Sequence, residues 1–208
     1  MNRLLLHPAA KPALWLLLCL PFAYYAYGAV ANTLGANPAE ALIRGFGDWT
    51  LRCLCLTLAV TPLRQWTNWS GLARFRRTLG VTTFVYGTLH WLSYAWLDQG
   101  FVLADLLKDI AKRPFILVGT LAWLAMLPLA ATSFNAAIKK LGAKRWQTLH
   151  KSVYAIVLLG LLHFFWKSAG KNNFGEWSVY AVIVAVLLGW RLLHYWRSRT
   201  ASARLRTA

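Results

Sequence analysis

Acidic residues are scarce in this sequence. Only six of its 208 residues are Asp or Glu, and all charged residues together make up 14% of the chain. A soluble domain of this size carries about a quarter charged residues. The composition therefore excludes an ordinary soluble domain. With 58% apolar residues and 12 Trp, the chain is predicted to be an all-α, polytopic membrane protein.

Cysteine is also rare. The three cysteines, Cys19, Cys53 and Cys55, all lie in apolar segments. Cys53 and Cys55 form a C-x-C pair that points to different faces of a helix, so neither a disulfide nor a zinc site is expected. The net charge of +17 is carried by short basic clusters between apolar runs, which is how membrane helices are oriented. We therefore expect contact with membrane lipid and no nucleic-acid binding.

Six apolar segments have lengths near the span of a bilayer, which needs about 20 helical residues. The sequence predicts a single transmembrane domain over 1–208, a six-helix bundle with helices at about 12–31, 46–66, 78–97, 114–138, 150–167 and 177–196. The second segment carries Arg52 one turn from its start, where a long side chain can reach the interface. The fifth is short, so its ends must extend into the interface.

The basic residues predict the orientation of the bundle. Six helices place both termini on one side, and a cytoplasmic amino terminus puts 16 of the 23 Lys and Arg in the cytoplasm. All six acidic residues then fall on the other side: Glu40, Asp48, Asp98, Asp105, Asp109 and Glu176. Both termini are therefore expected to be cytoplasmic.

Two histidines lie inside apolar segments that run in the same direction. His90 lies 13 residues after Arg77, and His163 lies 13 residues after His150. Equal steps along parallel helices reach equal depths, so His90 and His163 are expected at the same level, toward the outer face. Ionisable residues inside membrane segments usually serve a metal or a proton path.

A glycine precedes each of these histidines by three residues: Gly87 in G-T-L-H and Gly160 in G-L-L-H. Residues three apart share a helix face, so each glycine clears space for a flat macrocycle between the helices. The pattern predicts haem ligated by His90 and His163. In the alternative interpretation each histidine only hydrogen-bonds a neighbouring helix, and the glycines are ordinary helix contacts. Zinc is disfavoured because no carboxylate or thiol lies at that depth.

His150 does not share a helix face with His163 unless the helix is bent. Its counterpart in depth is Arg77, which cannot ligate iron, so a second haem at His150 would need another axial partner. Alternatively, His150 is an interfacial histidine. Arg76, Arg77 and His150 are expected to cluster at the cytoplasmic interface, where they would suit a flavin phosphate or a quinone. The arginines could equally be anchors that face anionic lipid.

Several motifs together resemble the MsrQ family (also called YedZ), the haem-binding membrane subunits of bacterial protein-methionine-sulfoxide reductase systems. They are L-G-A-N-P, L-T-L-A-V-T-P-L-R, R-F-R-R-T-L-G with L-H-W-L-S-Y, K-R-P-F-I-L-V-G, P-L-A-A-T-S, L-G-A-K-R-W-Q-T-L-H-K-S-V-Y and H-F-F-W. The chain is more distantly similar to the ferric reductase and NADPH oxidase membrane domain. In that domain, histidine pairs on the third and fifth helices hold two haems, and this sequence departs from the pattern at Arg77.

The resemblance implies a haem b cytochrome of the bacterial inner membrane. It implies electron donation by the quinone pool or a cytosolic flavin reductase, and an acceptor that is a periplasmic, molybdopterin-containing catalytic subunit (MsrP-like) that repairs oxidised proteins. It also implies that FMN can bind, although the sequence has no flavin motif. Only 12 residues follow Trp196, too few for a nucleotide-binding domain, so we expect a lipid-soluble donor or a separate protein.

Two other functions remain open at this stage. One is a self-sufficient transmembrane ferric or cupric reductase, and the other is a haem-free transporter or assembly factor whose histidines relay protons. The short outer loops carry no evident catalytic set, so no catalytic residues are expected and the substrate chemistry belongs to a partner.

Overall fold

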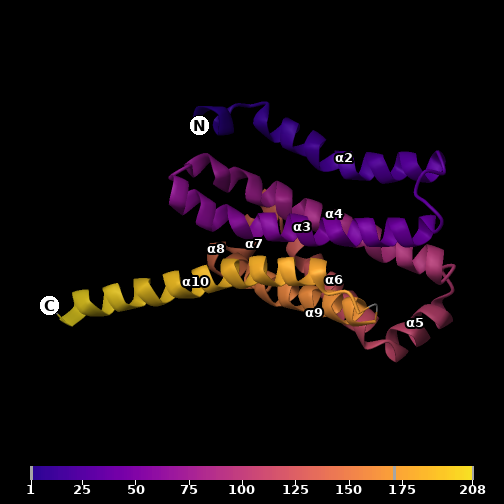
Figure 1. The fold of residues 1–208 in the computed structure, drawn as a ribbon. Helices are drawn as coiled ribbons and strands as arrows, with labels where there is room; N and C mark the ends of the chain where they lie inside the picture. The colour runs from indigo at the N-terminus through magenta and orange to yellow at the C-terminus, as the bar shows by residue number, and fades with distance from the viewer. Residues whose placement is uncertain (1, 171, 208) are drawn as a thin grey trace.

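Helices are the only regular secondary structure in the described part of the chain, which confirms the prediction of an all-α protein. The computed structural model describes residues 2–170 and 172–207, with side chains described up to residue 200, and no strand occurs in these ranges. The long helices run alongside one another, and both ends of the chain lie at the same end of the bundle (Figure 1). We refer to this end as the terminus end, and to the opposite end as the α5 end.

Ten α-helices and two short helices of other types follow one another along the described chain. They are α1 (Asn2–Leu6), α2 (Ala10–Val30), α3 (Pro38–Thr67), the 3₁₀ helix η1 (Ser70–Phe75), α4 (Arg76–Ser93), the π-helix η2 (Tyr94–Asp98), α5 (Leu103–Lys112), α6 (Pro114–Ala131), α7 (Asn135–Leu141), α8 (Ala143–His150), α9 (Val153–Ala169) and α10 (Gly175–Thr207).

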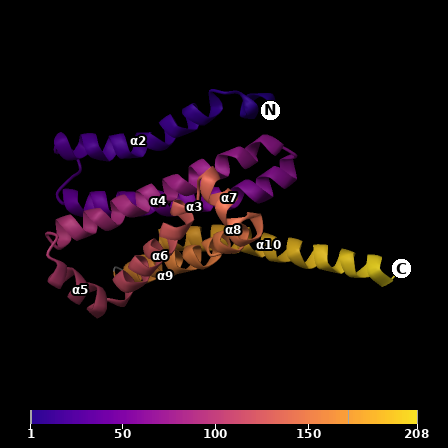
Figure 2. The ribbon, with the colours of Figure 1, turned by 180° about the vertical axis from the view of Figure 1, so that it is seen from behind.

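Helix α3 lies in the middle of the bundle. Its start is fixed by Pro38 at the first turn and by the Asn37 side chain, which accepts a hydrogen bond from the backbone of Glu40 at 3.1 Å. It runs beside α4, with α2 on one side and α6, α9 and α10 on the other (Figures 1 and 2). Its two cysteines face opposite sides, as predicted: Cys53 packs in the cluster shared with α2 and α4, and Cys55 in the cluster shared with α6, α9 and α10.

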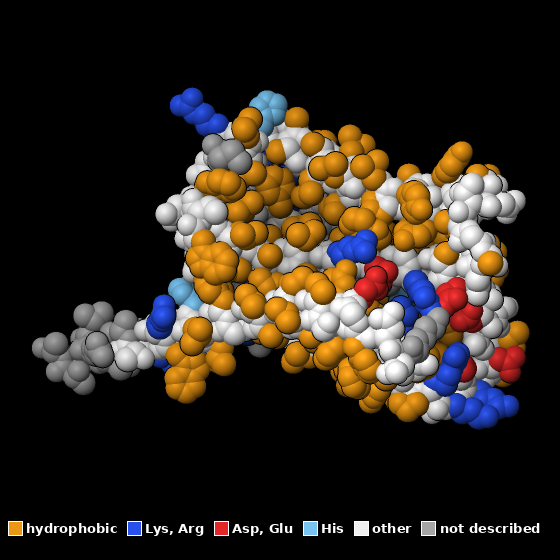
Figure 3. All heavy atoms as spheres, in the orientation of Figure 1, with side chains coloured by type: hydrophobic (Ala, Val, Ile, Leu, Met, Phe, Trp, Pro, Cys, Tyr) orange, Lys and Arg blue, Asp and Glu red, His pale blue; other side chains and the backbone are white. Residues whose placement is uncertain are grey.

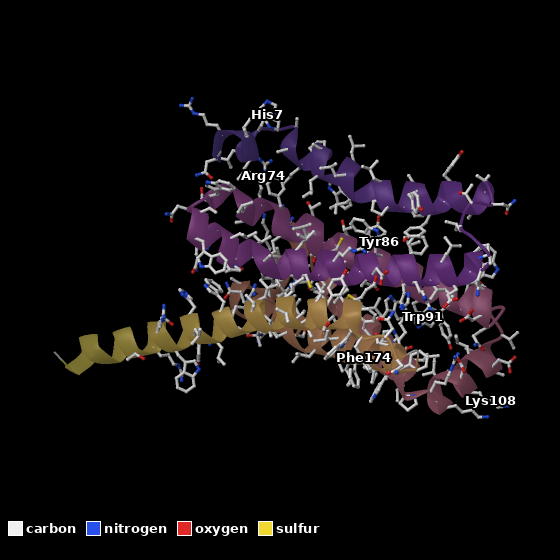
Figure 4. All side chains as sticks on the ribbon, viewed as in Figure 1. His7, Arg74, Tyr86, Trp91, Lys108 and Phe174 are labelled. Atoms are coloured by element: carbon white, nitrogen blue, oxygen red, sulfur yellow. The ribbon has the colours of Figure 1, made fainter. Side chains whose placement is uncertain are left out.

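Helix α4 is hydrogen-bonded to the backbone of α2 beside a proline. Pro21 lies inside α2, and proline removes a backbone donor from the helix. One turn of the hydrogen-bond ladder is bridged by the Tyr86 hydroxyl, which donates to the Leu18 carbonyl at 2.6 Å and accepts from the Phe22 amide at 3.2 Å. Tyr86 thereby joins α2 to α4 (Figure 4).

The segment expected at 114–138 is divided in the structure. Helix α6 ends at Ala131 and α7 begins at Asn135. The Thr132 and Ser133 hydroxyls donate to the carbonyls of Pro128 and Leu129, at 2.7 Å and 2.6 Å. These two hydrogen bonds satisfy carbonyls of the last turn, at the point where α6 ends.

The segment expected at 150–167 also begins differently. His150 is the last residue of the short helix α8, and a turn at Lys151 and Ser152 separates it from α9. The Ser152 hydroxyl donates to the Leu149 carbonyl at 2.8 Å, within this turn. The bend rotates His150 relative to the residues of α9.

Two further differences concern the loops and the end of the chain. Helix α5 lies within a stretch expected to be a loop, although Leu103, Leu106, Leu107 and Ile110 have the spacing of an amphipathic helix. Helix α10 continues to Thr207 instead of ending near 196, and it projects beyond the bundle (Figure 1). The side chains of Arg204 and Arg206, which are among the 16 basic residues predicted on the cytoplasmic side, lie outside the described residues.

Four helical stretches are long and apolar enough to cross a membrane: Ala10–Val30, Pro114–Ala131, Ala143–Ala169 and Gly175–Thr200. Helix α3 is less apolar because Arg44, Asp48 and Arg52 lie in its first half. Large apolar side chains cover the middle of the face seen in Figure 3, and its acidic side chains gather at the α5 end. The protein is therefore a multi-pass membrane protein.

Candidate functional site

The imidazole rings of His90 and His163 lie face to edge in the interior of the bundle. His90 comes from α4 and His163 from α9, and their ring centroids are 6.0 Å apart with an angle of 75° between the planes. Helices α3 and α6 lie against these two helices and provide the surroundings of the rings. The two histidines singled out in the sequence are thus brought together.

Each ring is held by the backbone of a neighbouring helix. The Nδ1 atom of His90 lies 2.7 Å from the Ile43 carbonyl in α3, and that of His163 lies 2.6 Å from the Phe115 carbonyl in α6. A carbonyl can only accept, so Nδ1 carries the proton in both rings. The other nitrogen, Nε2, then keeps its lone pair, which is the form of histidine that ligates a metal.

Two glycines make these contacts possible. Gly47 and Gly119 each lie four residues after the residue whose carbonyl binds an imidazole. A Cβ at Gly47 would be 3.1 Å from Nδ1 of His90, and one at Gly119 would be 2.7 Å from Nδ1 of His163. Each imidazole therefore rests directly on helix backbone that carries no side chain. Neither glycine was predicted as a site residue from the sequence.

A cavity of about 220 Å³ adjoins the two rings. Gly87 and Gly160 line it, as do Gly47 and Gly119. Nothing lies within 4 Å of the position that a Cβ at Gly160 would take, whereas a Cβ at Gly87 would be 3.0 Å from the terminal methyl of Met126. Gly160 thus borders open space, and Gly87 allows close packing of α4 on α6.

The two ends of this cavity differ in polarity. Toward the terminus end its wall consists of three buried apolar side chains, Leu54, Met126 and Ile156. Charged side chains occur in the rest of the lining, which we refer to as the α5-end rim: Arg44, Asp48, Asp98, Arg113 and Lys167. A ligand with one apolar and one polar edge would match this division.

The donor set fits a metal with two axial imidazoles. A first-row metal binds an imidazole nitrogen at about 2 Å and the ring centroid lies roughly 1 Å behind that nitrogen, so two rings on one metal have centroids about 6 Å apart. The separation of His90 and His163 agrees with this value. Within the described ranges no group of three or more His, Cys, Asp or Glu side chains gathers as a metal site. A pair of histidines matches haem iron better than a structural zinc ion, which takes four ligands.

His150 occupies a different site. Its ring stacks on Trp146 at 4.0 Å between centroids, and its Nε2 lies 3.1 Å from the Thr132 hydroxyl. The Trp146 indole in turn donates to the Thr132 carbonyl at 2.9 Å. His150 therefore packs on the break between α6 and α7, away from the ring of His163.

A second cavity, of about 490 Å³, lies toward the terminus end. Arg76, Arg77 and His150 all line it, so the structure brings together these three residues of the predicted cluster. Arg191 of α10, which was not among the predicted site residues, also lines it. Arg76 donates to the Thr61 hydroxyl at 2.9 Å, and the Arg191 guanidinium lies over the Tyr154 ring at 5.6 Å.

The two cavities share one wall. Leu54, Met126 and Ile156 line both of them. The remaining histidines lie elsewhere: His7 is at the exposed terminus end (Figure 4), and His194 stacks on Trp190 in α10 at 5.3 Å. A single layer of buried side chains therefore separates the histidine pair from the basic cavity.

Comparisons with known proteins give a consistent result. A family model described as the ferric reductase like transmembrane component matches residues 46–161. A protein of Polaromonas naphthalenivorans named protein-methionine-sulfoxide reductase heme-binding subunit MsrQ is 62% identical over 98% of this chain and 91% of its own length. Proteins of the same name from Ralstonia nicotianae and Bordetella pertussis are 50% and 48% identical, over 94% and 92% of this chain and 90% and 93% of their own lengths. No solved structure matches the chain.

Proposed function

Because this chain belongs to the MsrQ family of ferric reductase-like membrane proteins, we propose that it is a haem b subunit that carries electrons to a methionine sulfoxide reductase. This family membership confirms the resemblance to MsrQ proteins that the sequence motifs indicated. The names of the relatives describe a haem-binding subunit of a protein-methionine-sulfoxide reductase. The proposal transfers that role to this chain, in the bacterial inner membrane.

One observation carries the proposal: His90 and His163 lie 6.0 Å apart, each with Nδ1 on a backbone carbonyl. These hydrogen bonds fix the ring orientations and leave Nε2 as the nitrogen that can ligate iron. A haem iron between two imidazoles accepts and releases one electron at a time. The protein's part is to hold both rings in place and to surround the site with apolar side chains.

The proposed architecture is a six-helix bundle with both termini in the cytoplasm. The six helices are α2, α3, α4, α6, α9 and α10. Both ends of the chain lie at the terminus end, and the acidic side chains visible in Figure 3 lie at the other. The excess of Lys and Arg at the terminus end favours the cytoplasmic side. The histidine pair then lies in the outer half of the membrane.

Electron entry is proposed at the basic cavity near the terminus end. Arg76, Arg77 and His150 line it, and such donors suit a quinone that gains negative charge, or the phosphate of FMN. The donor is the quinone pool or a cytosolic flavin reductase. A second haem is not part of this proposal, because His150 packs on Trp146 and Thr132.

The electron acceptor is proposed to be a periplasmic, molybdopterin-containing partner that reduces methionine sulfoxide in damaged proteins. The reduction takes two electrons and two protons and yields methionine and water, and it takes place on the partner. His90 and His163 lie near the carboxyl-terminal ends of α4 and α9, on the side of the α5 end (Figure 1), which favours delivery on that side. A self-sufficient ferric or cupric reductase is the alternative that the family description favours. Ferric or cupric reduction by the chain without its partner would support this alternative.

A reduced-minus-oxidised spectrum of the purified full chain tests the proposal. Low-spin haem gives sharp visible bands, and we expect His90→Ala or His163→Ala to remove most of the bound haem. His194→Ala is the matched control, because His194 stacks on Trp190 outside both cavities. Normal haem content in the His163→Ala protein would refute the ligand assignment, and a haem-free wild-type protein would favour a transporter or assembly factor.

A further inference from the structure

Two hydrogen-bond donors at the histidine cavity are buried without an acceptor. They are the indole Nε1 of Trp91 and the guanidinium Nε of Arg113. Both residues line the cavity beside His90 and His163. Buried donors are nearly always paired, because an unpaired one loses its hydrogen bond to water without compensation. Two such donors at one cavity suggest an acceptor that belongs to a ligand.

Neighbouring residues hold both donors in place. The Trp91 indole stacks on the Trp123 ring, with 4.8 Å between centroids and 10° between planes, and Trp123 in turn donates to the Thr88 hydroxyl at 3.0 Å. Figure 4 shows Trp91 between the layer of α3 and α4 and the layer below it, toward the α5 end. The Arg113 guanidinium is anchored through its Nη2 by an ion pair with Asp109. These contacts restrict both side chains, so neither donor can rotate freely toward another acceptor.

A third donor of the same rim is Lys167. It lies one turn after His163 in α9, lines the cavity, and has its ammonium 5.1 Å from the centroid of the Phe164 ring. The rim as a whole carries three cations, Arg44, Arg113 and Lys167, against two carboxylates, Asp48 and Asp98. Arg44 is already paired with Glu40 and Arg113 with Asp109, so Lys167 is the rim cation that supplies positive charge for an anionic ligand group.

We propose that the α5-end rim binds the two carboxylates of the haem through Trp91 Nε1, Arg113 Nε and Lys167. This inference rests on the proposed haem function and adds an orientation to it. The apolar wall of Leu54, Met126 and Ile156 receives the hydrocarbon edge of the macrocycle, and the rim receives its acidic edge. The carboxylates thus point to the α5 end, where their charge is closest to water.

Cofactor selectivity tests this orientation. The haem-free full chain in detergent is titrated with protohaem and with its dimethyl ester, which has the same macrocycle but no carboxylate charge. We expect the wild-type protein to bind protohaem about tenfold or more tightly than the ester, since hydrogen bonds to charged groups are the strong ones. Trp91→Phe and Lys167→Gln should weaken binding of protohaem and leave binding of the ester unchanged.

Trp96→Phe is the matched control, because Trp96 is 64% exposed near the same end of the bundle. It should preserve the preference for protohaem. Equal binding of both cofactors by the wild-type protein, or an equal loss of both in the Trp91→Phe and Lys167→Gln proteins, would overturn the proposed orientation while leaving haem binding intact. Failure of the wild-type protein to bind either cofactor would instead overturn the proposed function, and the inference with it.

Discussion

Gly119 leaves no room for a side chain beside the imidazole of His163. A Cβ at this position would lie 2.7 Å from Nδ1 and 2.9 Å from Cε1 of the ring. The same ring nitrogen binds the Phe115 carbonyl, one turn earlier in α6, at 2.6 Å. The absence of a side chain at Gly119 is therefore what allows this hydrogen bond to orient the ring.

Gly119→Ala should displace the His163 ring and lower haem content by more than half, because the methyl group occupies space that the ring needs. Gly47→Ala should have a smaller effect, since its Cβ would lie 3.1 Å from the His90 ring and a small shift relieves the contact. Haem per protein, measured from the spectrum of the purified variants, checks both.

Gly189→Ala in α10 is the control for these glycine variants, because nothing lies within 4 Å of its Cβ position. It should keep full haem content and normal yield. Full loading of the Gly119→Ala protein would show that the ring does not need its contact with α6.

The bridge between Tyr86 and α2 leads to a prediction on stability. Tyr86→Phe removes both hydrogen bonds that join α4 to the Leu18 carbonyl and the Phe22 amide of α2, at a residue of which only 2% is exposed. A hydrogen bond within a protein contributes about 0.5–1.5 kcal/mol to stability, so we expect a lower melting temperature in detergent. Tyr24→Phe in α2, where the tyrosine is 66% exposed, should melt like the wild-type protein. Identical melting of both variants would contradict the bridge.

The lowered pKa of Asp109 predicts that the stability of the α5 end depends on pH. Burial acts to raise the pKa of Asp109, but hydrogen bonds from Arg113 and Tyr94 outweigh it and place the pKa below its ordinary value. A lowered folded-state pKa stabilises the fold above the unfolded pKa of about 3.9 and loses this contribution as the pH falls through the folded value. The protection of the α5 amides against hydrogen exchange, relative to their intrinsic rates at each pH, should therefore be high at neutral pH and fall below about pH 4.

Asp109→Asn should remove this pH dependence and accelerate exchange in α5 already at neutral pH. The matched control is Asp105→Asn, which changes an exposed carboxylate of the same helix and should retain the wild-type profile. A wild-type profile in the Asp109→Asn protein would mean that other contacts hold α5 in place.

Helical geometry explains which features of the site could be predicted from the sequence. His90 and His163 were expected at one depth because equal numbers of residues precede them in parallel segments, and the structure places their rings 6.0 Å apart. Their carbonyl partners, Ile43 and Phe115, come from other helices. No spacing within a single segment encodes such a contact, so Gly47 and Gly119 were missed.

Hydroxyl residues lie at the helix ends that follow Ala131 and His150, but an averaged hydropathy does not show them. The hydroxyls of Thr132, Ser133 and Ser152 donate hydrogen bonds to carbonyls of the preceding turn. These three residues hardly change the mean hydropathy over 20 positions. Both breaks determine the basic cavity, because Thr132 binds His150 there. Hydroxyl residues alone do not identify such helix ends, because Thr50 and Thr57 make the same hydrogen bond within α3.

The basic cavity leads to the last prediction, which concerns electron entry. Arg77 and His150 line this cavity, and Leu54, Met126 and Ile156 separate it from the histidine pair. If an anionic quinone or flavin group binds there, Arg77→Ala or His150→Ala should weaken its binding about tenfold, through loss of one charge-assisted hydrogen bond. The haem spectrum should remain, because neither residue contacts the rings of His90 or His163.

Stopped-flow reduction by a quinol analogue and by reduced flavin measures this effect. Arg74→Ala is the control, because Arg74 belongs to the same basic motif but donates to the backbone carbonyl of Leu5 at 3.0 Å (Figure 4). An arginine that serves only as a lipid anchor would change insertion or yield and leave the reduction rate intact. Wild-type rates with both donors in the Arg77→Ala and His150→Ala proteins would exclude the cavity as the entry site, and loss of haem in the latter would make His150 an iron ligand instead.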